Sequence, residues 1–286
     1  MNEADGNIFI PQTLVDIFDR SSLIDISLVL FGGMLVAALV GYAIRKSPRL
    51  FLPERKEEGG QEAYVVSAVL GLLALLMGFT FSLSLSRFEE RRELVLVEAN
   101  AIGTAHLRTS LIEEPWRGQL RETLEDYAQN RLDLSGGIDE ELPERLVRNE
   151  VLLGQMWAQT SAMVEGQGAS PITAQFVGSI NEVIDMDTAR KNARLAKVPS
   201  AVYAVLLVYI MIAALILGYS LVGFWARLAA VVLFLLLSLS MLLIIDIDRP
   251  TVGMLREQQA PLKALLLSFD PDRDMEQAIQ PYLEMR

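Results

Sequence analysis

A set of five residues with helical spacing lies in one apolar stretch and has the chemistry to line a path for ions. Gly71, Leu75, Phe79, Ser82 and Ser86 are separated by four, four, three and four positions, so they share one face of a helix. A ring of such helices would place a hydrophobic constriction at Leu75 and Phe79, beside a polar vestibule at the two serines. Hydrophobic constrictions gate ions by dewetting. The alternative is ordinary packing, because Gly and Ser are common at contacts between membrane helices.

Charged residues follow this stretch and also end the last apolar run. We interpret the first group as a membrane-interface cluster, with simple anchoring at the lipid headgroups as the alternative. Its members are Arg87, Phe88, Glu90 and Arg91. The second group is a post-span acidic motif. It consists of Asp246, Asp248, Arg249 and Pro250. Because a charge inside the hydrocarbon is costly, its aspartates are expected to pair, with the arginine as a local partner, or to lie at the headgroups.

Residues suited to enzyme catalysis are scarce. The chain has one histidine, His106, and no cysteine, which excludes thiolate metal sites and cysteine nucleophiles. Acidic pairs such as Glu89-Glu90 and Glu113-Glu114 are adjacent, and neighbours on a helix point about 100° apart, so these pairs do not converge. The sequence contains no Gly-rich phosphate loop and no nucleophile elbow. We therefore expect no enzyme activity, catalytic residue, cofactor or metal, and a surface or packing role for His106.

The elements that must position these residues are apolar runs, four of them within 286 residues. A run of roughly 20 apolar residues crosses a bilayer as a helix, and no strand-like alternation of useful length appears. The sequence therefore predicts an all-α, four-span transmembrane protein with a helical soluble domain between spans 2 and 3. The predicted order is an N-terminal amphipathic segment (1–26), spans 1 and 2 (27–86), the soluble domain (87–198), spans 3 and 4 (199–246) and a C-terminal helical tail (247–286).

Proline and glycine predict the limits of the helices. Residues 87–112 lack proline and are predicted to continue the second span without a break, with Glu98 beside an apolar stripe. Further helices are predicted at 116–132, 142–164 and 171–198. The third span is predicted to run to about residue 224, followed by a short hairpin at 225–227.

The four spans and the distribution of charge together predict a multi-pass protein of the cell inner (plasma) membrane. The net charge of −11 argues against nucleic acid as a partner. Four spans put both termini on one side, and basic residues near span ends favour the cytoplasm. The basic clusters at 87–92 and 190–197 therefore favour cytoplasmic termini and a cytoplasmic soluble domain, weighed against five basic residues in the loop at 45–62 and Arg227 on the opposite side. The N-terminus lacks the basic region and cleavage site of a signal peptide, so the first span is expected to be retained.

The segment from Gly78 to Glu93 resembles the second transmembrane segment of bestrophins. A Gly-Phe pair is followed there at the same distance by Arg, an aromatic and an acidic residue, here Arg87, Phe88 and Glu90, although Glu89 replaces a second aromatic. The segment after the last span is also similar to bestrophins, with shifted spacing. Its matching positions are Asp248, Pro250, Gly253, Pro261 and Leu262. The string RFEERRELVLVEANAIGTAHLR is closer still to bacterial membrane proteins described as bestrophin-like.

This resemblance implies an ion channel, a homopentamer in which five copies of the second helix surround a pore. The three apolar residues of the bestrophin neck correspond to Gly71, Leu75 and Phe79, and Gly71 would widen its ring. Asp246 and Asp248 lie near the calcium clasp of animal bestrophins without reproducing its spacing. The implied partners are the lipid bilayer, inorganic ions and other copies of the chain. The alternative, favoured by departures from the family pattern, is a non-conducting membrane scaffold or sensor that binds a partner through its acidic helical domain.

Overall fold

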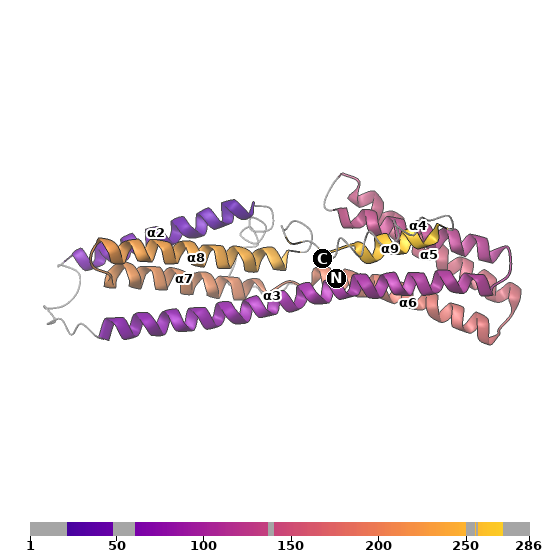
Figure 1. Cartoon of the computed structure of the whole chain (residues 1–286), viewed down its shortest axis with the longest axis horizontal. Coiled ribbons are helices and arrows are strands. Elements are labelled where there is room, and N and C mark those ends of the chain that lie inside the picture. The colour runs from indigo at the N-terminus through magenta and orange to yellow at the C-terminus, as the bar shows by residue number, and fades with distance from the viewer. Residues whose placement is uncertain (1–21, 48–60, 137–139, 250–254, 256, 271–286) are drawn as a thin grey trace, which may run out of the picture. The chain divides into compact units, whose positions relative to one another are not determined.

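The computed structural model describes residues 22–47, 61–136, 140–249, 255 and 257–270. Within these residues every regular element is a helix, which confirms the all-α fold class (Figure 1). Four of the described helices are long and apolar enough to cross a membrane. Most of the predicted N-terminal amphipathic segment, and Pro250, lie outside the described residues. The chain divides into two compact units: unit 1 (residues 1–86 and 197–249) and unit 2 (residues 87–196 and 250–286).

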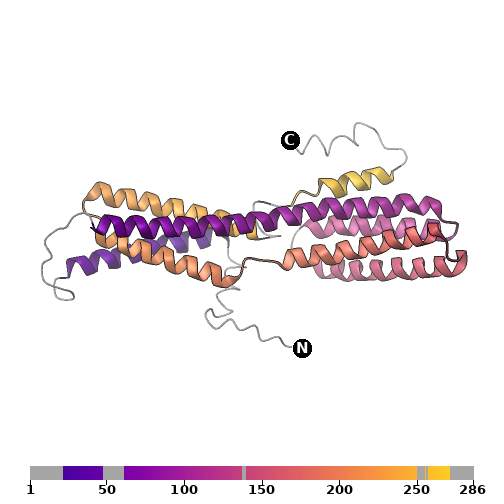
Figure 2. The ribbon, with the colours of Figure 1, turned by 90° about the horizontal axis from the view of Figure 1, so that it is seen from below.

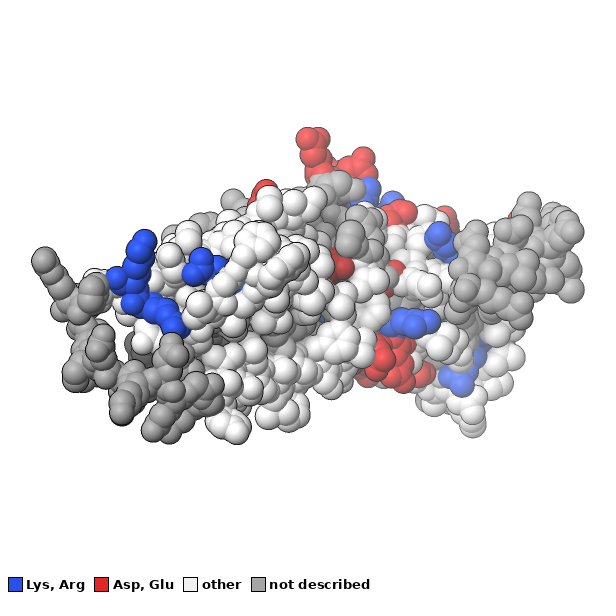
Figure 3. Space-filling model, turned by 60° about the vertical axis from the view of Figure 1, so that its left-hand side comes forward, with Lys and Arg blue, Asp and Glu red and all other residues white. Residues whose placement is uncertain are grey.

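Unit 1 is built from apolar helices that lie side by side in Figures 1 and 2. They are α2 (Leu23–Lys46), the first part of α3 (Gln61–Arg108), α7 (Ser200–Ser220) and α8 (Phe224–Asp248). The hydroxyl of Ser22 caps α2 by accepting a hydrogen bond from the backbone N–H of Ile24. On the face in Figure 3, uncharged side chains cover most of unit 1, and Lys and Arg gather at one end. This distribution is typical of a unit embedded in a membrane.

Two glycines let α2 and α7 pack closely. A methyl group at Gly41 would lie 2.0 Å from the carbonyl oxygen of Leu215, and one at Gly218 would lie 2.0 Å from the carbonyl oxygen of Ala38. Small residues allow membrane helices to approach at this distance. Larger side chains fill the rest of the core, among them Leu30, Met34, Leu206, Ile210 and Phe234.

The connection between α7 and α8 differs from the sequence prediction. α7 ends at Ser220 and α8 begins at Phe224, so the hairpin predicted at 225–227 lies inside α8. The turn occupies residues 221–223, where Gly223 has a φ of 92°. The prediction is wrong because the chain turns at glycine, which adopts positive φ without steric cost, and not at the charged Arg227.

α3 continues from unit 1 into unit 2 as one helix of 48 residues, as the absence of proline predicts. Unit 2 adds α4 (Trp116–Asp133), α5 (Leu142–Gln167), α6 (Pro171–Leu195) and α9 (Ala260–Phe269). α6 begins at a capping box formed by Ser170 and Thr173. It ends at Leu195, before the predicted residue 198. Val198 itself is disfavoured in a helix because it directly precedes Pro199.

Apolar side chains from the helices of unit 2 form a second core. Its members include Val95, Ile102, Leu120, Leu124, Met156, Phe176, Ile180 and Leu262. α5 also makes close contact with the start of α4, since a methyl group at Gly166 would lie 2.2 Å from the ring of Trp116. Each unit therefore has its own core, and α3 contributes side chains to both.

Candidate functional site

α3 packs into unit 1 through one face and leaves the opposite face uncovered. Its buried side chains in this unit are Leu73, Met77, Thr80 and Ser84. The five residues of the predicted pore face are all exposed, with Leu75 at 53% and Phe79 at 65%. At 100° per residue, the centres of the two sets lie about 170° apart around the helix. The structure thus brings Gly71, Leu75, Phe79, Ser82 and Ser86 onto one face that the rest of the unit leaves open.

This face carries more small and polar side chains than the other exposed faces of unit 1. α8 exposes Leu235 and Leu239, which suit lipid tails, together with Ser240, whose hydroxyl donates a hydrogen bond to the Leu236 carbonyl. α2 exposes Val36. The α3 face instead includes Gly71, where a methyl group would meet no atom within 4 Å, and exposed serines such as Ser82. Because a hydroxyl loses its hydrogen bonds to water in hydrocarbon, this face suits water or another protein surface better than lipid.

A carboxylate from the second half of α3 lies among buried cations in unit 2. Glu98 is fully buried, and its Oε1 lies 2.7 Å from Nε of Arg131 in α4. Its Oε2 pairs with Arg190 in α6. The hydroxyl of Tyr127 also donates a hydrogen bond to Glu98, at 3.3 Å. Glu98 therefore joins three helices through ion pairs with two arginines and hydrogen bonds from Arg190 and Tyr127. The sequence analysis missed this arrangement when it placed Glu98 beside the apolar stripe.

A second carboxylate extends this network. Asp187 of α6 lies 3.2 Å from Nη1 of Arg131 and accepts a hydrogen bond from Asn149 of α5 at 3.0 Å. Burial by itself lowers the pKa of Arg131, but Glu98 and the other acceptors raise this pKa above its ordinary value, so the guanidinium stays charged. Burial raises the pKa of the Tyr127 hydroxyl, which therefore stays a neutral donor. The helices of unit 2 are held together around a buried ionic cluster.

The residues of the predicted membrane-interface cluster differ in exposure and in contacts. Arg87 and Phe88 are half-buried, and Glu90 is exposed. Arg91 is buried, and its Nε lies 3.5 Å from Oε1 of Glu257, on the segment before α9. The helix therefore turns Arg91 into unit 2 and leaves Glu90 outside.

One of the post-span acidic residues, Asp248, connects the ends of two helices in unit 1. Asp246, Asp248 and Arg249 are buried. Both carboxylate oxygens of Asp248 accept hydrogen bonds from the backbone N–H of Val198, at 3.0 and 3.2 Å. Val198 precedes Pro199, the N-cap of α7, so Asp248 ties the start of α7 to the end of α8. In the part of the chain that the structure describes, no three His, Asp or Glu side chains are arranged to hold a metal ion.

The single histidine packs inside unit 2. Nε2 of His106 lies 2.8 Å from Oε1 of Glu125 in α4, and its ring stacks on Phe269 of α9 with centroids 4.1 Å apart. Burial lowers the pKa of His106, and Arg121 adds to this effect, while the hydrogen bond to Glu125 opposes it. His106 is therefore a packing residue between α3, α4 and α9.

Comparison with known proteins identifies related sequences and folds. The bestrophin-like domain model matches residues 31–262. A bacterial bestrophin homologue from Klebsiella pneumoniae with a tryptophan-to-alanine mutation is similar in structure, with a TM-score of 0.63, 16% identity, and coverage of 92% of this chain and 98% of that chain. The homologue solved with zinc phasing has a TM-score of 0.60 and 18% identity, over 91% and 98% of the two chains. No curated protein matches the chain.

Proposed function

Because the chain belongs to the bestrophin-like family of membrane proteins, we propose that it forms an ion channel whose pore is lined by the exposed face of α3. One copy supplies one helix to this lining, so several copies are needed to enclose a pore. The resemblance to bestrophins favours five. The proposed lining residues are Gly71, Leu75, Phe79, Ser82 and Ser86.

The observation that carries this proposal is the uncovered face of α3. Leu75 and Phe79 are more than half exposed although they lie in an apolar helix whose opposite side is fully packed. Exposed serines continue the same face. A face with both properties is expected where a helix borders a path that is dry at one level and wet at another.

The proposed pore has a constriction and a wider mouth. Leu75 and Phe79 are four positions apart, about one helical turn, and their side chains would form two successive apolar rings. Gly71 lacks a side chain, so the ring at that level would be wider. In a pore of this kind the apolar rings oppose the passage of ions by excluding water.

Acidic residues continue this face and would favour cations. Along α3, steps of four, three and four positions lead from Ser82 to Ser86, Glu89 and Glu93. Both glutamates are exposed. Rings of acidic side chains attract cations in channel pores, so we expect potassium to pass more readily than halides.

Flux measurements on purified protein in liposomes test the channel. We expect Phe79→Ala to raise potassium flux above that of the wild type, because it removes an apolar ring. Leu75→Ala should act in the same direction. The matched control is Leu239→Ala, since Leu239 is 50% exposed, close to the 53% of Leu75, and belongs to α8 and not to the proposed pore face of α3.

The outcomes separate two functions. Flux that rises in the α3 variants and stays unchanged in Leu239→Ala supports a pore at this face. Absence of flux from every variant, in protein whose assembly has been verified, would refute the channel. The remaining function would then be the non-conducting scaffold or sensor, in which unit 2 binds a partner protein.

We further propose that the protein is a multi-pass protein of the inner (plasma) membrane with unit 2 and both termini in the cytoplasm. The basic residues at 87–92 and 190–197 favour this orientation. The chain has no cysteine, so single cysteines can report topology with a membrane-impermeant maleimide. Trp225→Cys, at an exposed position where α8 begins, should react in intact cells, and Ala169→Cys, in the exposed turn between α5 and α6, only after permeabilisation. The reverse pattern would invert the orientation.

A further inference from the structure

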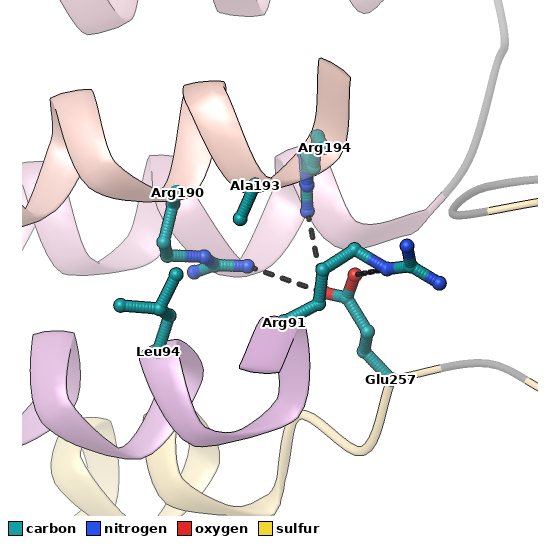
Figure 4. A pocket seen from close by; sticks show the side chains of 6 residues that line it. All are labelled: Arg91, Leu94, Arg190, Ala193, Arg194 and Glu257. Carbon is teal, nitrogen blue, oxygen red and sulfur yellow. Dashed lines mark ion pairs between the residues drawn. The ribbon is translucent and has the colours of Figure 1, made fainter. Parts of the chain in front are cut away.

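Three arginines of unit 2 surround one carboxylate without approaching it closely. Glu257 is buried just before α9. Nε of Arg91 lies 3.5 Å from its Oε1, and the Nη2 atoms of Arg190 and Arg194 lie 3.7 and 3.9 Å from its Oε2 (Figure 4). Charge-assisted N–H···O bonds are ordinarily about 2.7–2.9 Å long. Glu257 therefore supplies charge to this cluster but makes poor hydrogen bonds.

Neither the arginines nor Glu257 satisfy their hydrogen-bonding groups here. Nη2 of Arg190, Nε of Arg194 and Oε1 of Glu257 are buried and make no hydrogen bond within the described part of the chain. Figure 4 shows both side chains pointing from α6 toward the Glu257 carboxylate. A carboxylate has two oxygens, whereas a phosphate group offers at least three strong acceptor oxygens and more negative charge. Planar guanidinium groups also match phosphate geometry.

Three arginine side chains share this one carboxylate, so positive charge exceeds negative charge within the group. Burial, the largest effect, and the neighbouring Arg190 lower the pKa of Arg194 to about 10, although Glu257 and Glu98 oppose them. Arg190 also serves Glu98 in the buried network, so its charge is divided between two carboxylates. A second negative charge would therefore be stabilised beside these arginines.

The space around the cluster is already filled by Glu257. The pocket lined by Arg91, Arg190, Arg194, Glu257 and two apolar neighbours contains about 130 Å³ not occupied by atoms, part of it open to solvent, and it has no room for a further water-sized molecule. An incoming anion can bind here only if the Glu257 side chain moves away. We propose that Arg91, Arg190 and Arg194 form a binding site for a phosphate-type anion, and that Glu257 occupies this site when the anion is absent.

Two sources can supply such a group. Arg91 lies five positions after Ser86, and Arg194 lies six positions before Ser200, where α7 begins. Both arginines are thus close in sequence to segments expected to cross the membrane, where anionic lipid headgroups are recognised by basic pockets. The other source is free phosphate in solution. The chemistry required of the site is the same for both.

Thermal unfolding of the full chain in neutral detergent tests the site. Sodium phosphate is titrated against sodium chloride at constant ionic strength, because a ligand that binds the folded state raises the unfolding midpoint with ligand concentration. We expect a saturable rise for the wild type and about tenfold tighter phosphate binding by Glu257→Gln, since the competing charge is lost. Arg194→Gln should abolish the rise. The control is Arg148→Gln, which alters an exposed arginine of unit 2 that pairs with Asp126 at 3.5 Å.

Vesicles distinguish the two sources. Stabilisation by phosphatidylglycerol vesicles over phosphatidylcholine vesicles, lost in Arg194→Gln and kept in Arg148→Gln, assigns the site to a lipid headgroup. The same pattern with free phosphate alone assigns it to a soluble anion. A rise that persists in Arg194→Gln, or no rise with either source in the wild type and Glu257→Gln, overturns the proposal. If Glu257→Gln does not fold, the wild type and the two arginine variants decide the outcome. Ion flux is not measured, so the result is independent of the proposed pore.

Discussion

Replacing Glu98 with glutamine should destabilise unit 2 strongly. Glu98 is fully buried and pairs with Arg131 and Arg190, which are themselves buried. Glutamine keeps the shape of the side chain but removes the charge that two guanidinium groups share. Removing one partner of a buried ion pair costs about 3–5 kcal/mol. For a domain of this size each kcal/mol lowers the unfolding midpoint by about 2–4 °C, so we expect a loss of about 6–20 °C.

Tryptophan fluorescence can follow this loss in one unit. Trp116 and Trp157 belong to unit 2, and replacing Trp225 with phenylalanine removes the signal from unit 1. The control is Asp126→Asn, which breaks an exposed pair with Arg148 on α5 and should cost less than about 1 kcal/mol. If Glu98→Gln lowers the midpoint no more than Asp126→Asn does, the buried network does not stabilise unit 2 and the reasoning is refuted.

Two further substitutions test packing and protonation. Gly218→Ala should destabilise unit 1 by about 1–3 kcal/mol because its methyl group would overlap backbone atoms of α2. Gly78→Ala, where nothing lies within 4 Å, should leave the unfolding midpoint unchanged or raise it, and equal losses in both variants would contradict the proposed close packing. The pKa of His106 is lower in the folded protein than its ordinary value of 6.5, so the unfolded chain binds more protons near pH 6 and stability should fall as pH decreases through 6.5. His106→Gln should reduce the dependence of the unfolding free energy on pH between pH 7.5 and 5.5. An unchanged dependence would mean that other titrating groups cause it.

Features that depend on one helix could be predicted from the sequence. The apolar runs, the absence of proline in α3 and the start of α6 at Pro171 each act locally, and the structure agrees with them to within a few residues. The failure at the α7–α8 turn has a local cause too. Gly223 lies among apolar residues and resembles part of a span, and its positive φ is a property of the folded backbone.

The buried charge network could not be predicted in the same way. Glu98, Arg131 and Arg190 are separated by 33 and 59 positions, and charged residues on soluble helices usually face water. One signal was present. Glu98 lies between Val95 and Ile102 at steps of three and four, which puts it on the buried stripe of α3. That spacing indicates a buried carboxylate, but it does not identify the helices that supply its partners.

The sequence allowed two interpretations of the exposed face of α3, which were pore lining and ordinary packing between helices. The structure limits the second interpretation. Packing against another helix of unit 1 does not account for this face, since that unit packs against Leu73 and Met77 on the opposite side. Packing between copies and pore lining both require assembly, but they differ in what Leu75 and Phe79 touch. At an interface between copies, truncating these side chains removes buried area and weakens assembly. In a pore they face an opening, so truncation widens the passage and leaves assembly intact. Measuring the oligomeric state of Leu75→Ala and Phe79→Ala together with their flux therefore separates the two roles.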